Sequence, residues 1–173
     1  MAFRWKSIPS METSRLVLRA LGADEAEDLL QIYGDPEVMR YEADPIFPET
    51  SYVHRMLADV ARRFAIRDAL EWGVELKETG LVVGICGLHS FDEARSHAEV
   101  GCLLARSYWG NGIMSEALQS LIGFATEELR LSSLFADIDA SNLRSMKLFK
   151  GLGFLACGPN TFEKVLKTSR NFE

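Results

Sequence analysis

The stretch that most constrains the fold of this chain is the glycine-bearing segment 107–117 (SYWGNGIMSEA). It follows an apolar run at 100–105 that is typical of a strand, and it opens an amphipathic run at 116–129 that is typical of a helix. The first N–H groups of a helix have no partner within the helix, and the helix dipole favours an anion there. Because Gly110 and Gly112 lack a Cβ, an anion can approach their backbone closely. The pattern therefore indicates a ligand that carries a pyrophosphate.

Taken alone, a glycine pair between a strand and a helix is more often an ordinary turn. The segment is not a P-loop, because no Gly-Lys-Ser/Thr follows it. It also lacks the third glycine of a dinucleotide-binding fingerprint and lies late in the chain. A nucleotide-binding domain of another type, with affinity for ATP or NAD, remains the weakest of the alternatives.

The composition describes an ordinary globular chain of 173 residues, long enough for one domain with a single sizeable core. The formal net charge is -6, and no run of Lys or Arg forms a basic stripe. This argues against nucleic acid as a partner, since phosphate backbones are bound by clustered cations. An acidic surface mildly favours an amine-bearing partner, although it also serves solubility alone.

The cysteines carry no metal-binding or redox pattern. Cys86, Cys102 and Cys157 are widely spaced, and no His pair has metal-ligand spacing, so we expect reduced core residues and no metal. No apolar run reaches the length of a membrane span, and residues 1–10 are not followed by the apolar region of a secretory signal. These features predict a cytoplasmic protein that does not bind membranes.

Hydrophobic periodicity and turn residues predict one α/β (α+β) domain over residues 1–173, without repeats or linkers. Strands are expected at 16–18, 71–77, 81–88, 99–105 and 134–138, helices at 24–33, 49–67, 113–130 and 142–150, and a last hairpin at 154–157 and 162–166. The three consecutive middle strands have tight connections, which favours an antiparallel meander. Residues 1–11 form an N-terminal extension.

Several segments, in this order, resemble the superfamily of GNAT N-acetyltransferases, and within it the branch that acetylates protein N-termini, the ribosomal-protein alanine acetyltransferase type. They are 12–19 (ETSRLVLR), 35–41 (DPEVMRY), 98–101 (AEVG), 108–117, and the signature of Asn142, Ser145, Gly153 and Phe154. The resemblance implies a mixed central sheet of six to seven strands with a splay at the acetyl-CoA site, and helices on both faces. It also implies acetyl transfer from acetyl-CoA to a primary amine by direct attack in a ternary complex, and a possible homodimer.

The resemblance assigns a set of residues to acetyl-CoA. The pyrophosphate would bind the N–H groups of 109–114, and the pantetheine would run beside the strand at 102–104 like an added strand. Asn142 would bond the pantetheine amides or the acceptor, although Asn is also well suited to cap a helix. The expected binding residues are Cys102, Leu103, Leu104, Trp109, Gly110, Asn111, Gly112, Ile113, Met114 and Asn142.

Transfer to an amine requires a base, an oxyanion donor and a proton for the leaving thiolate. Glu99 is the expected base, acting through a water, unless it is an ordinary exposed carboxylate at a strand end. The backbone N–H near Leu103 would polarise the thioester. Phe149 stands where much of the superfamily has a tyrosine acid, so Ser145 becomes the expected acid. Otherwise Ser145 only binds the pantetheine and solvent supplies the proton.

The chain departs from the family pattern at several positions. Ser107 stands where the loop usually begins with Gln or Arg, with the cation one position earlier at Arg106, and Gly151 replaces a usual lysine. The segment 155–173 is atypical, so the last hairpin is expected to be short or to be completed by a second subunit. The acceptor remains open between a protein N-terminus and a small amine (a polyamine, an amino acid or an aminoglycoside). A non-catalytic acyl-CoA-binding protein is a further alternative.

Overall fold

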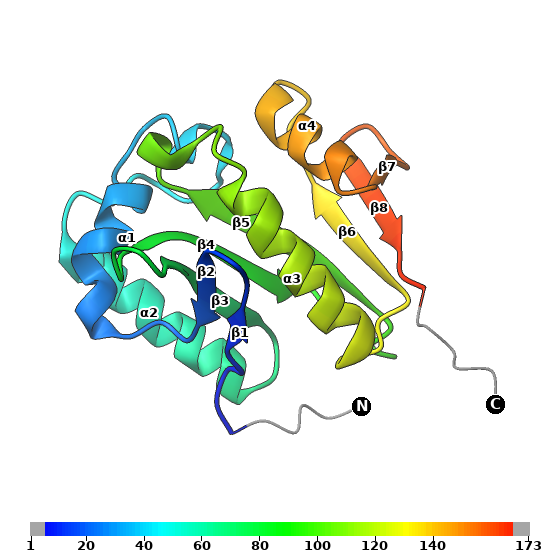
Figure 1. Cartoon of the computed structure of the whole chain (residues 1–173), viewed down its shortest axis with the longest axis horizontal. Coiled ribbons are helices and arrows are strands. Elements are labelled where there is room, and N and C mark those ends of the chain that lie inside the picture. The colour runs from blue at the N-terminus through cyan, green and yellow to red at the C-terminus, as the bar shows by residue number, and fades with distance from the viewer. Residues whose placement is uncertain (1–5, 168–173) are drawn as a thin grey trace.

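The computed structural model describes residues 6–167 and places eight strands in one mixed sheet (Figure 1). The strands are β1 (Met11–Glu12), β2 (Leu16–Arg19), β3 (Leu70–Leu76), β4 (Val82–His89), β5 (His97–Leu104), β6 (Ser133–Asp137), β7 (Leu155–Ala156) and β8 (Thr161–Val165). Their order across the sheet is β1-β2-β3-β4-β5-β6-β8-β7. The expected mixed α/β architecture is confirmed. The strand number exceeds the expected six to seven, because β1 is too short for its periodicity to be read from the sequence.

The middle of the sheet is the antiparallel meander that the sequence predicts. β3 pairs with β4 and β4 pairs with β5, all antiparallel. The alternating side chains of Leu70, Trp72 and Val74 are fully buried, because they project from the face of β3 that packs against a helix. This register also decides which polar side chains share the opposite face.

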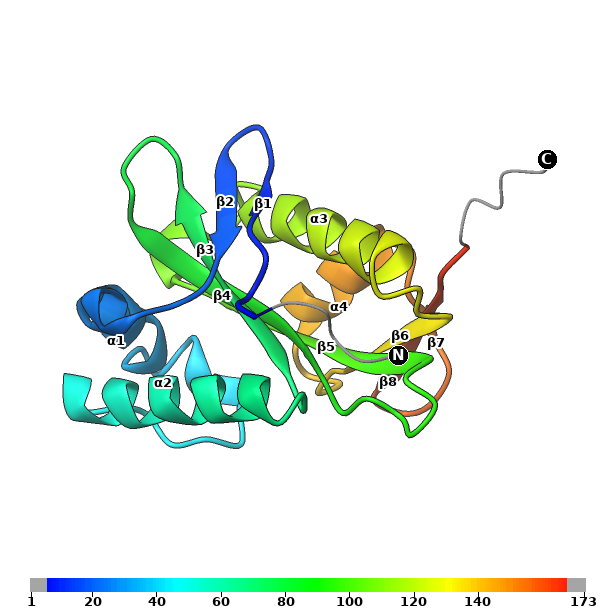
Figure 2. The same cartoon turned by 90° about the horizontal axis from the view of Figure 1, so that it is seen from below.

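The helices divide between the two faces of the sheet (Figure 2). They are α1 (Ala26–Tyr33), α2 (Thr50–Ala65), α3 (Ile113–Glu127) and α4 (Leu143–Gly151), with short 3-10 turns η1 (Ala23–Glu25), η2 (Met39–Tyr41) and η3 (Arg106–Tyr108). α1 and α2 cover one face, while α3 and the apolar side chains of α4 join the core on the other. All four helices lie within a few residues of their predicted ranges.

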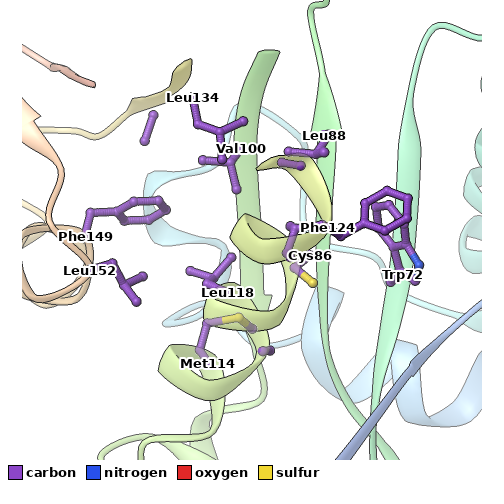
Figure 3. Packing of buried hydrophobic residues seen from close by; sticks show 14 of the residues in the cluster. Trp72, Cys86, Leu88, Val100, Met114, Leu118, Phe124, Leu134, Phe149 and Leu152 are labelled. Atoms are coloured by element: carbon purple, nitrogen blue, oxygen red, sulfur yellow. The ribbon is translucent and has the colours of Figure 1, made fainter. Parts of the chain in front are cut away.

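The larger core lies between α3 and the sheet (Figure 3). Leu118 and Leu121 of α3 are fully buried against strand residues such as Leu88. Burying one such leucine contributes about 2 kcal/mol relative to exposure. Phe149 of α4 meets Phe154 edge-on at 5.1 Å between ring centroids, which fixes the C-terminal hairpin to the core. α3 is therefore held rigidly, and with it the loop that precedes it.

β5 and β6 are parallel neighbours only at their first residues. Pairing runs from His97 with Ser133 to Glu99 with Phe135, and then stops although both strands continue. β6 instead pairs along its whole length with β8. The expected splay is therefore present, and beyond Glu99 one edge of β5 has no strand partner.

The ends of the described chain complete the sheet. β8 pairs with both β6 and β7, so the hairpin closes the sheet within this chain; residues 168–173 lie outside the described part. At the other end, part of the expected N-terminal extension packs on the fold, since the indole Nε1 of Trp72 donates to the carbonyl of Pro9 at 2.7 Å. Residues 1–5 lie outside the described part.

The cysteines fit their predicted environment only in part. Cys86 is buried and Cys102 is half-buried, but Cys157 is exposed, so the core prediction was wrong for Cys157. It follows β7 at the tip of the last hairpin, where a side chain has no core to enter. Between residues 6 and 167, no helix is long and apolar enough to cross a bilayer.

Candidate active site

A cleft of about 950 Å³ opens where β5 and β6 separate. Its walls come from β3, β4, β5, the end of β6, the loop before α3, the first turn of α3, α4 and the segment around η2, with Tyr33 of α1 and Arg63 of α2. This volume is within the range of small-molecule sites. The cleft brings together almost all of the residues expected to act on acetyl-CoA and amine, namely Glu99, Cys102, Leu103, Leu104, Trp109, Gly110, Gly112, Ile113, Met114, Asn142 and Ser145. Asn111 is the exception.

The loop before α3 has the backbone of an anion cradle. Gly110 and Gly112 have φ angles of 80° and 73°, which L side chains rarely adopt. Within the described residues, the backbone N–H groups of 110–115 have no hydrogen-bond acceptor, because they belong to a turn and to the first turn of α3. The N–H of Trp109 differs, since it donates to the carbonyl of Arg106 at 3.1 Å. The free N–H groups therefore begin at Gly110, one residue later than expected.

Asn111 stabilises the loop rather than lining the cleft. Its Nδ2 donates to the carbonyls of Tyr108 and Trp109 at 3.2 and 3.3 Å. Its own carbonyl accepts a hydrogen bond of 3.0 Å from Nη1 of Arg15. Asn111 thus stabilises the turn through hydrogen bonds within the loop and does not line the cleft.

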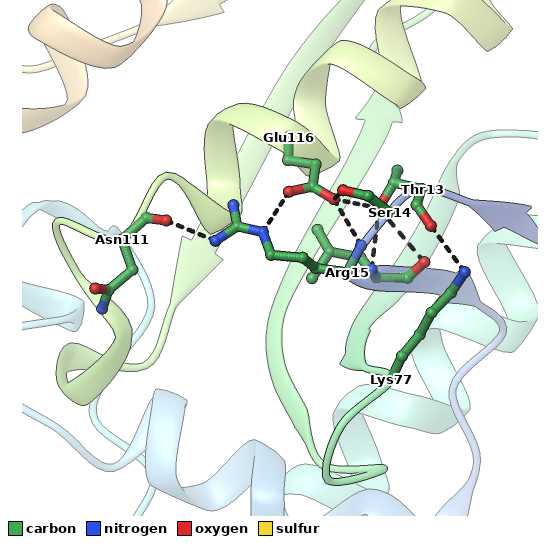
Figure 4. A network of polar contacts seen from close by, with 7 residues as sticks. Thr13, Ser14, Arg15, Lys77, Asn111 and Glu116 are labelled. Atoms are coloured by element: carbon green, nitrogen blue, oxygen red, sulfur yellow. Dashed lines mark hydrogen bonds and ion pairs between the residues drawn. The ribbon is translucent and has the colours of Figure 1, made fainter.

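Glu116, in the first turn of α3, anchors the loop to the turn between β1 and β2 (Figure 4). Its Oε1 accepts from the hydroxyls of Thr13 and Ser14 and from the backbone N–H of Arg15, and its Oε2 accepts from Nε of Arg15 at 2.6 Å. Burial alone would raise the pKa of Glu116, but these donors together lower it to about 2. These residues lie in two segments that resemble the family, but their contact with one another is not predictable from the sequence.

Trp109 connects the two sides of the splay. Its Nε1 donates to the carbonyl of Leu104 at 2.8 Å, and the guanidinium carbon of Arg144 lies 3.1 Å from the centroid of its ring. A second contact joins η2 to the α4 side, where the hydroxyl of Tyr41 donates to the carbonyl of Ser141 at 3.2 Å. Arg144, which sequence reasoning did not single out, therefore holds a cation above the cleft.

Arg106 does not supply that cation. Its Nε lies 3.6 Å from Oδ2 of Asp35, on the segment that follows α1, and Arg106 is absent from the cleft lining. The neighbouring Ser107 is exposed. The loop therefore offers backbone N–H groups to an anion, and the cationic side chains of Arg15 and Arg144 contact it at Asn111 and Trp109.

Glu99 lies at the apex of the splay, in the last residue pair that joins β5 to β6. Its side chain is about one third exposed and faces the cleft. His89 is opposite it on β4, with its Nδ1 3.9 Å from Oε2 of Glu99 and 3.0 Å from the hydroxyl of Ser90. Burial lowers the pKa of His89, although the charge of Glu99 opposes that shift. Sequence reasoning missed His89, because only the strand register brings it to Glu99.

Asn142 and Ser145 occupy the first turn of α4. Oδ1 of Asn142 accepts from the backbone N–H of Ser145 at 3.1 Å, which is an N-cap, so the capping role of Asn142 is present in the structure. Its Nδ2 remains available to the cleft, and so does the hydroxyl of Ser145. One turn later, Phe149 is buried and has no proton to give.

Three comparisons with known proteins agree with this geometry. The model of the acetyltransferase (GNAT) domain family matches residues 15–155. The chain belongs to the GNAT acetyltransferase family. An uncharacterized N-acetyltransferase, p20, from Bacillus licheniformis is 33% identical over 145 residues, which cover 84% of this chain and 82% of p20. The family match and such relatives show that this GNAT protein is an N-acetyltransferase.

Solved structures of other GNAT proteins share the fold. RimL, a ribosomal L7/L12 alpha-N-protein acetyltransferase in complex with coenzyme A, superposes with a TM-score of 0.80 at 14% identity, and the match covers 94% of this chain and 99% of the RimL chain. The ribosomal-protein-S5-alanine acetyltransferase from Vibrio fischeri has a TM-score of 0.75 at 18% identity and covers 94% and 98%. At such identities the likeness concerns the fold of this GNAT acetyltransferase alone.

Proposed function

We propose that this GNAT protein transfers the acetyl group of acetyl-CoA to a primary amine by direct attack, with both substrates held in the cleft. The observation that carries the proposal is the row of free N–H groups at 110–115, which opens onto the same cleft as Glu99. A pyrophosphate and a reacting amine would therefore occupy one continuous space. Acetyl-CoA supplies the activated acyl group as a thioester.

The donor side of the cleft fits acetyl-CoA in three respects. Gly110 and Gly112 leave their backbone N–H groups open to a pyrophosphate. The edge of β5 at 102–104 has no strand partner toward β6, so the backbone groups of Cys102 and Leu104 suit the pantetheine amides, whereas those of Leu103 face Ile85 of β4. The carbonyl of Leu104 is already bonded to Trp109, which limits that pairing at the loop end. Asn142 would offer its Nδ2 from the other side.

Glu99 is proposed to accept the proton of the attacking amine through a water. An amine is protonated at neutral pH, and only the neutral form attacks a carbonyl, so the site must remove a proton. Glu99 has no cationic side chain bonded to it among residues 6–167, and its nearest titratable neighbour is the imidazole of His89. The carboxylate is thus free to act, and the backbone N–H near Leu103 would polarise the acetyl carbonyl.

Ser145 is proposed to give the proton that the leaving thiolate takes up. Ser145 faces the cleft from the first turn of α4, whereas Phe149 is buried and has no proton to donate. In the alternative, Ser145 only binds the pantetheine and water supplies the proton, which a thiolate accepts readily.

Two classes of acceptor are candidates. A protein N-terminal amine is the acceptor that the names of RimL and of the S5-alanine acetyltransferase give for those proteins. A small amine is the other candidate, and the carboxylates that line the acceptor side of the cleft favour it. The cytoplasmic location and the homodimer expected from the sequence remain proposals.

The first experiment is calorimetric titration of the protein with acetyl-CoA, beside ATP and NAD. Binding of acetyl-CoA alone, followed by release of free thiol on addition of amines, supports the transferase. Equal affinity for ATP or NAD refutes the assignment of the loop. Tight binding of acetyl-CoA without turnover of any amine favours a non-catalytic acyl-CoA-binding protein.

A further inference from the structure

A hollow lies beside Glu99 on the face of the sheet that α1 and α2 cover. In the strand register, Glu71 of β3 lies opposite Gly87 of β4, and Gly87 lies opposite Gly101 of β5. Side chains of paired residues point to the same face of a sheet, so these three positions lie on the face toward which His89 and Glu99 also point. The two glycines have no side chains, so those of Glu71 and His89 lie over the strands at these positions and line the cleft: a Cβ on Gly87 would lie 3.3 Å from Cγ of Glu71, and one on Gly101 would lie 3.4 Å from Nε2 of His89.

The walls of this hollow are acidic. Glu42 and Asp44, in the segment after η2, line the cleft together with Glu71 and Glu99. On the side of the cleft that α1 and α2 cover, Arg63 is the cationic residue of the lining, and its Nε is bonded to Oδ2 of Asp68 at 2.8 Å. The other lining cations, Arg144 and Lys147, belong to α4 across the splay.

Two polar groups at the floor lack partners. Tyr33 is 6% exposed and lines the cleft, yet its hydroxyl has no hydrogen bond within the described part of the chain. Burial, and then the charges of Glu71, Asp44 and Glu42, raise the pKa of Tyr33, so the three carboxylates surround one neutral phenol. Glu71 also has no hydrogen bond or ion pair among residues 6–167, and burial raises its pKa. Both residues line the cleft and neither polar group is sealed in the core, so a ligand in the cleft can reach them.

We propose that the acceptor carries a second protonated amine, which binds between Tyr33, Glu71 and the Glu42–Asp44 rim while its first amine faces Glu99. This makes the acceptor a diamine or polyamine, and the inference rests on the proposed transferase function. Glu71 and Glu99 are two strands and two residues apart, or about 12 Å between Cα atoms, which suits nitrogens at the two ends of a short aliphatic chain.

In the reaction only the first amine changes. Its neutral nitrogen forms a bond to the acetyl carbon while the carbon–sulfur bond of the thioester breaks. One proton leaves the nitrogen toward Glu99, and one proton is taken up by the thiolate, so the products are an N-acetyl amine and free coenzyme A. The second amine stays protonated, and Glu71 with the hydroxyl oxygen of Tyr33 accepts its hydrogen bonds.

The test compares kcat/KM for 1,4-diaminobutane and butylamine, which differ by one amine, after correction for the neutral fraction of each. Three further acceptors extend the series: spermidine, an aminoglycoside, and a peptide with a free N-terminal amine and no charged side chains. The variants are Glu71→Gln and Tyr33→Phe, with Glu78→Gln in the exposed turn after β3 as the matched control. Thermal melting shows that each variant is folded, and acetyl-CoA titration of the same samples tests the proposed function separately.

We expect the wild-type protein to favour the diamine over butylamine by at least tenfold. Glu71→Gln and Tyr33→Phe should lower that ratio severalfold, and Glu78→Gln should leave it unchanged. Equal rates for the two amines, a ratio unaffected by Glu71→Gln, or a preference for the peptide overturns the inference while the transferase stands. A higher kcat/KM for the aminoglycoside than for spermidine would refute a linear polyamine as the acceptor and favour a cationic sugar. Failure to bind acetyl-CoA refutes the proposed function and this inference together.

Discussion

The Nδ1 atom of His89 lies 3.9 Å from Oε2 of Glu99, at the point where β5 and β6 stop pairing. The two residues face each other because β4 and β5 pair in antiparallel register. Since burial lowers the pKa of His89, the imidazole is neutral at pH 7 and gives Glu99 no full counter-charge. The carboxylate at the apex of the splay is therefore free to take a proton.

Glu99→Gln tests that role directly. The amide keeps the shape of the side chain but cannot accept a proton, so we expect kcat to fall at least a hundredfold with every amine. The affinity for acetyl-CoA should be unchanged, because Glu99 is on the acceptor side of the apex. Steady-state kinetics and calorimetry on one preparation check both, with Glu78→Gln as control. A kcat within threefold of wild type would show that Glu99 is an ordinary strand-end carboxylate.

The pH dependence separates His89 from Glu99. His89 is held neutral down to a pH below its ordinary pKa of about 6.5. When the pH falls through its own pKa, the imidazolium stabilises the carboxylate of Glu99 and repels an ammonium ion, so activity drops. The charge of Asp68 also opposes the lowered pKa of His89, while the charge of Arg63 promotes it.

For His89→Gln we therefore expect a shallower fall of log(kcat/KM) than for the wild type in the acidic range, below the ordinary histidine pKa of about 6.5. The measurement is a pH–rate profile with one amine, in which the ionisation of the amine is common to both proteins. Identical profiles would exclude the imidazole from the reaction.

The sequence predicted best where one residue type is required locally. Positive φ angles need glycine at 110 and 112, and a helix start needs a cap such as Asn142, so both were found. His89 and Glu71 were missed, because strand register alone brings them to the cleft, and the contact of Arg15 with Glu116 was missed because it joins distant segments. The backbone N–H of Trp109 was expected to bind the pyrophosphate, but it is bonded within the loop. The side chain of Trp109 contributes to the site instead.

Glu116→Gln should destabilise the fold in a pH-dependent manner. The pKa of Glu116 is about 2 in the folded state and about 4.3 in an unfolded chain, so its carboxylate stabilises the fold above pH 4.3. That contribution is lost as the pH falls from about 4.3 toward 2. At pH 7 we expect the variant to lose about 2 kcal/mol in the free energy of unfolding, since charged hydrogen bonds from Thr13, Ser14 and Arg15 weaken.

Urea denaturation at pH 7 and near pH 3 measures this difference. Glu127→Gln, at an exposed position near the end of the same helix, is the matched control and should change stability little at either pH. A loss for Glu116→Gln that is equal at both pH values would mean that packing, not charge, holds the loop to the β1–β2 turn.

Gly112→Ala tests the anion cradle. The backbone of Gly112 has a φ of 73°, which costs an alanine about 1 kcal/mol, although a Cβ there meets only Nη2 of Arg15 at 3.6 Å. The strain should shift the N–H groups at the start of α3, and we expect acetyl-CoA to bind about tenfold more weakly. Gly123→Ala is the control within α3, because its Cβ would meet nothing and alanine favours a helix. Calorimetry that finds equal weakening in both variants would contradict the cradle.

Asn142→Asp separates the two roles of Asn142. Aspartate caps a helix as well as asparagine does, so its Oδ1 should keep the bond to the N–H of Ser145 and the melting temperature should hold. The amide Nδ2 is lost, however, and a negative charge enters the cleft near the edge of β5. We therefore expect acetyl-CoA to bind at least tenfold more weakly by calorimetry, whereas Asn142→Ala should lose affinity and about 1 kcal/mol of stability together. Unchanged affinity in Asn142→Asp would leave Asn142 with the cap as its whole function.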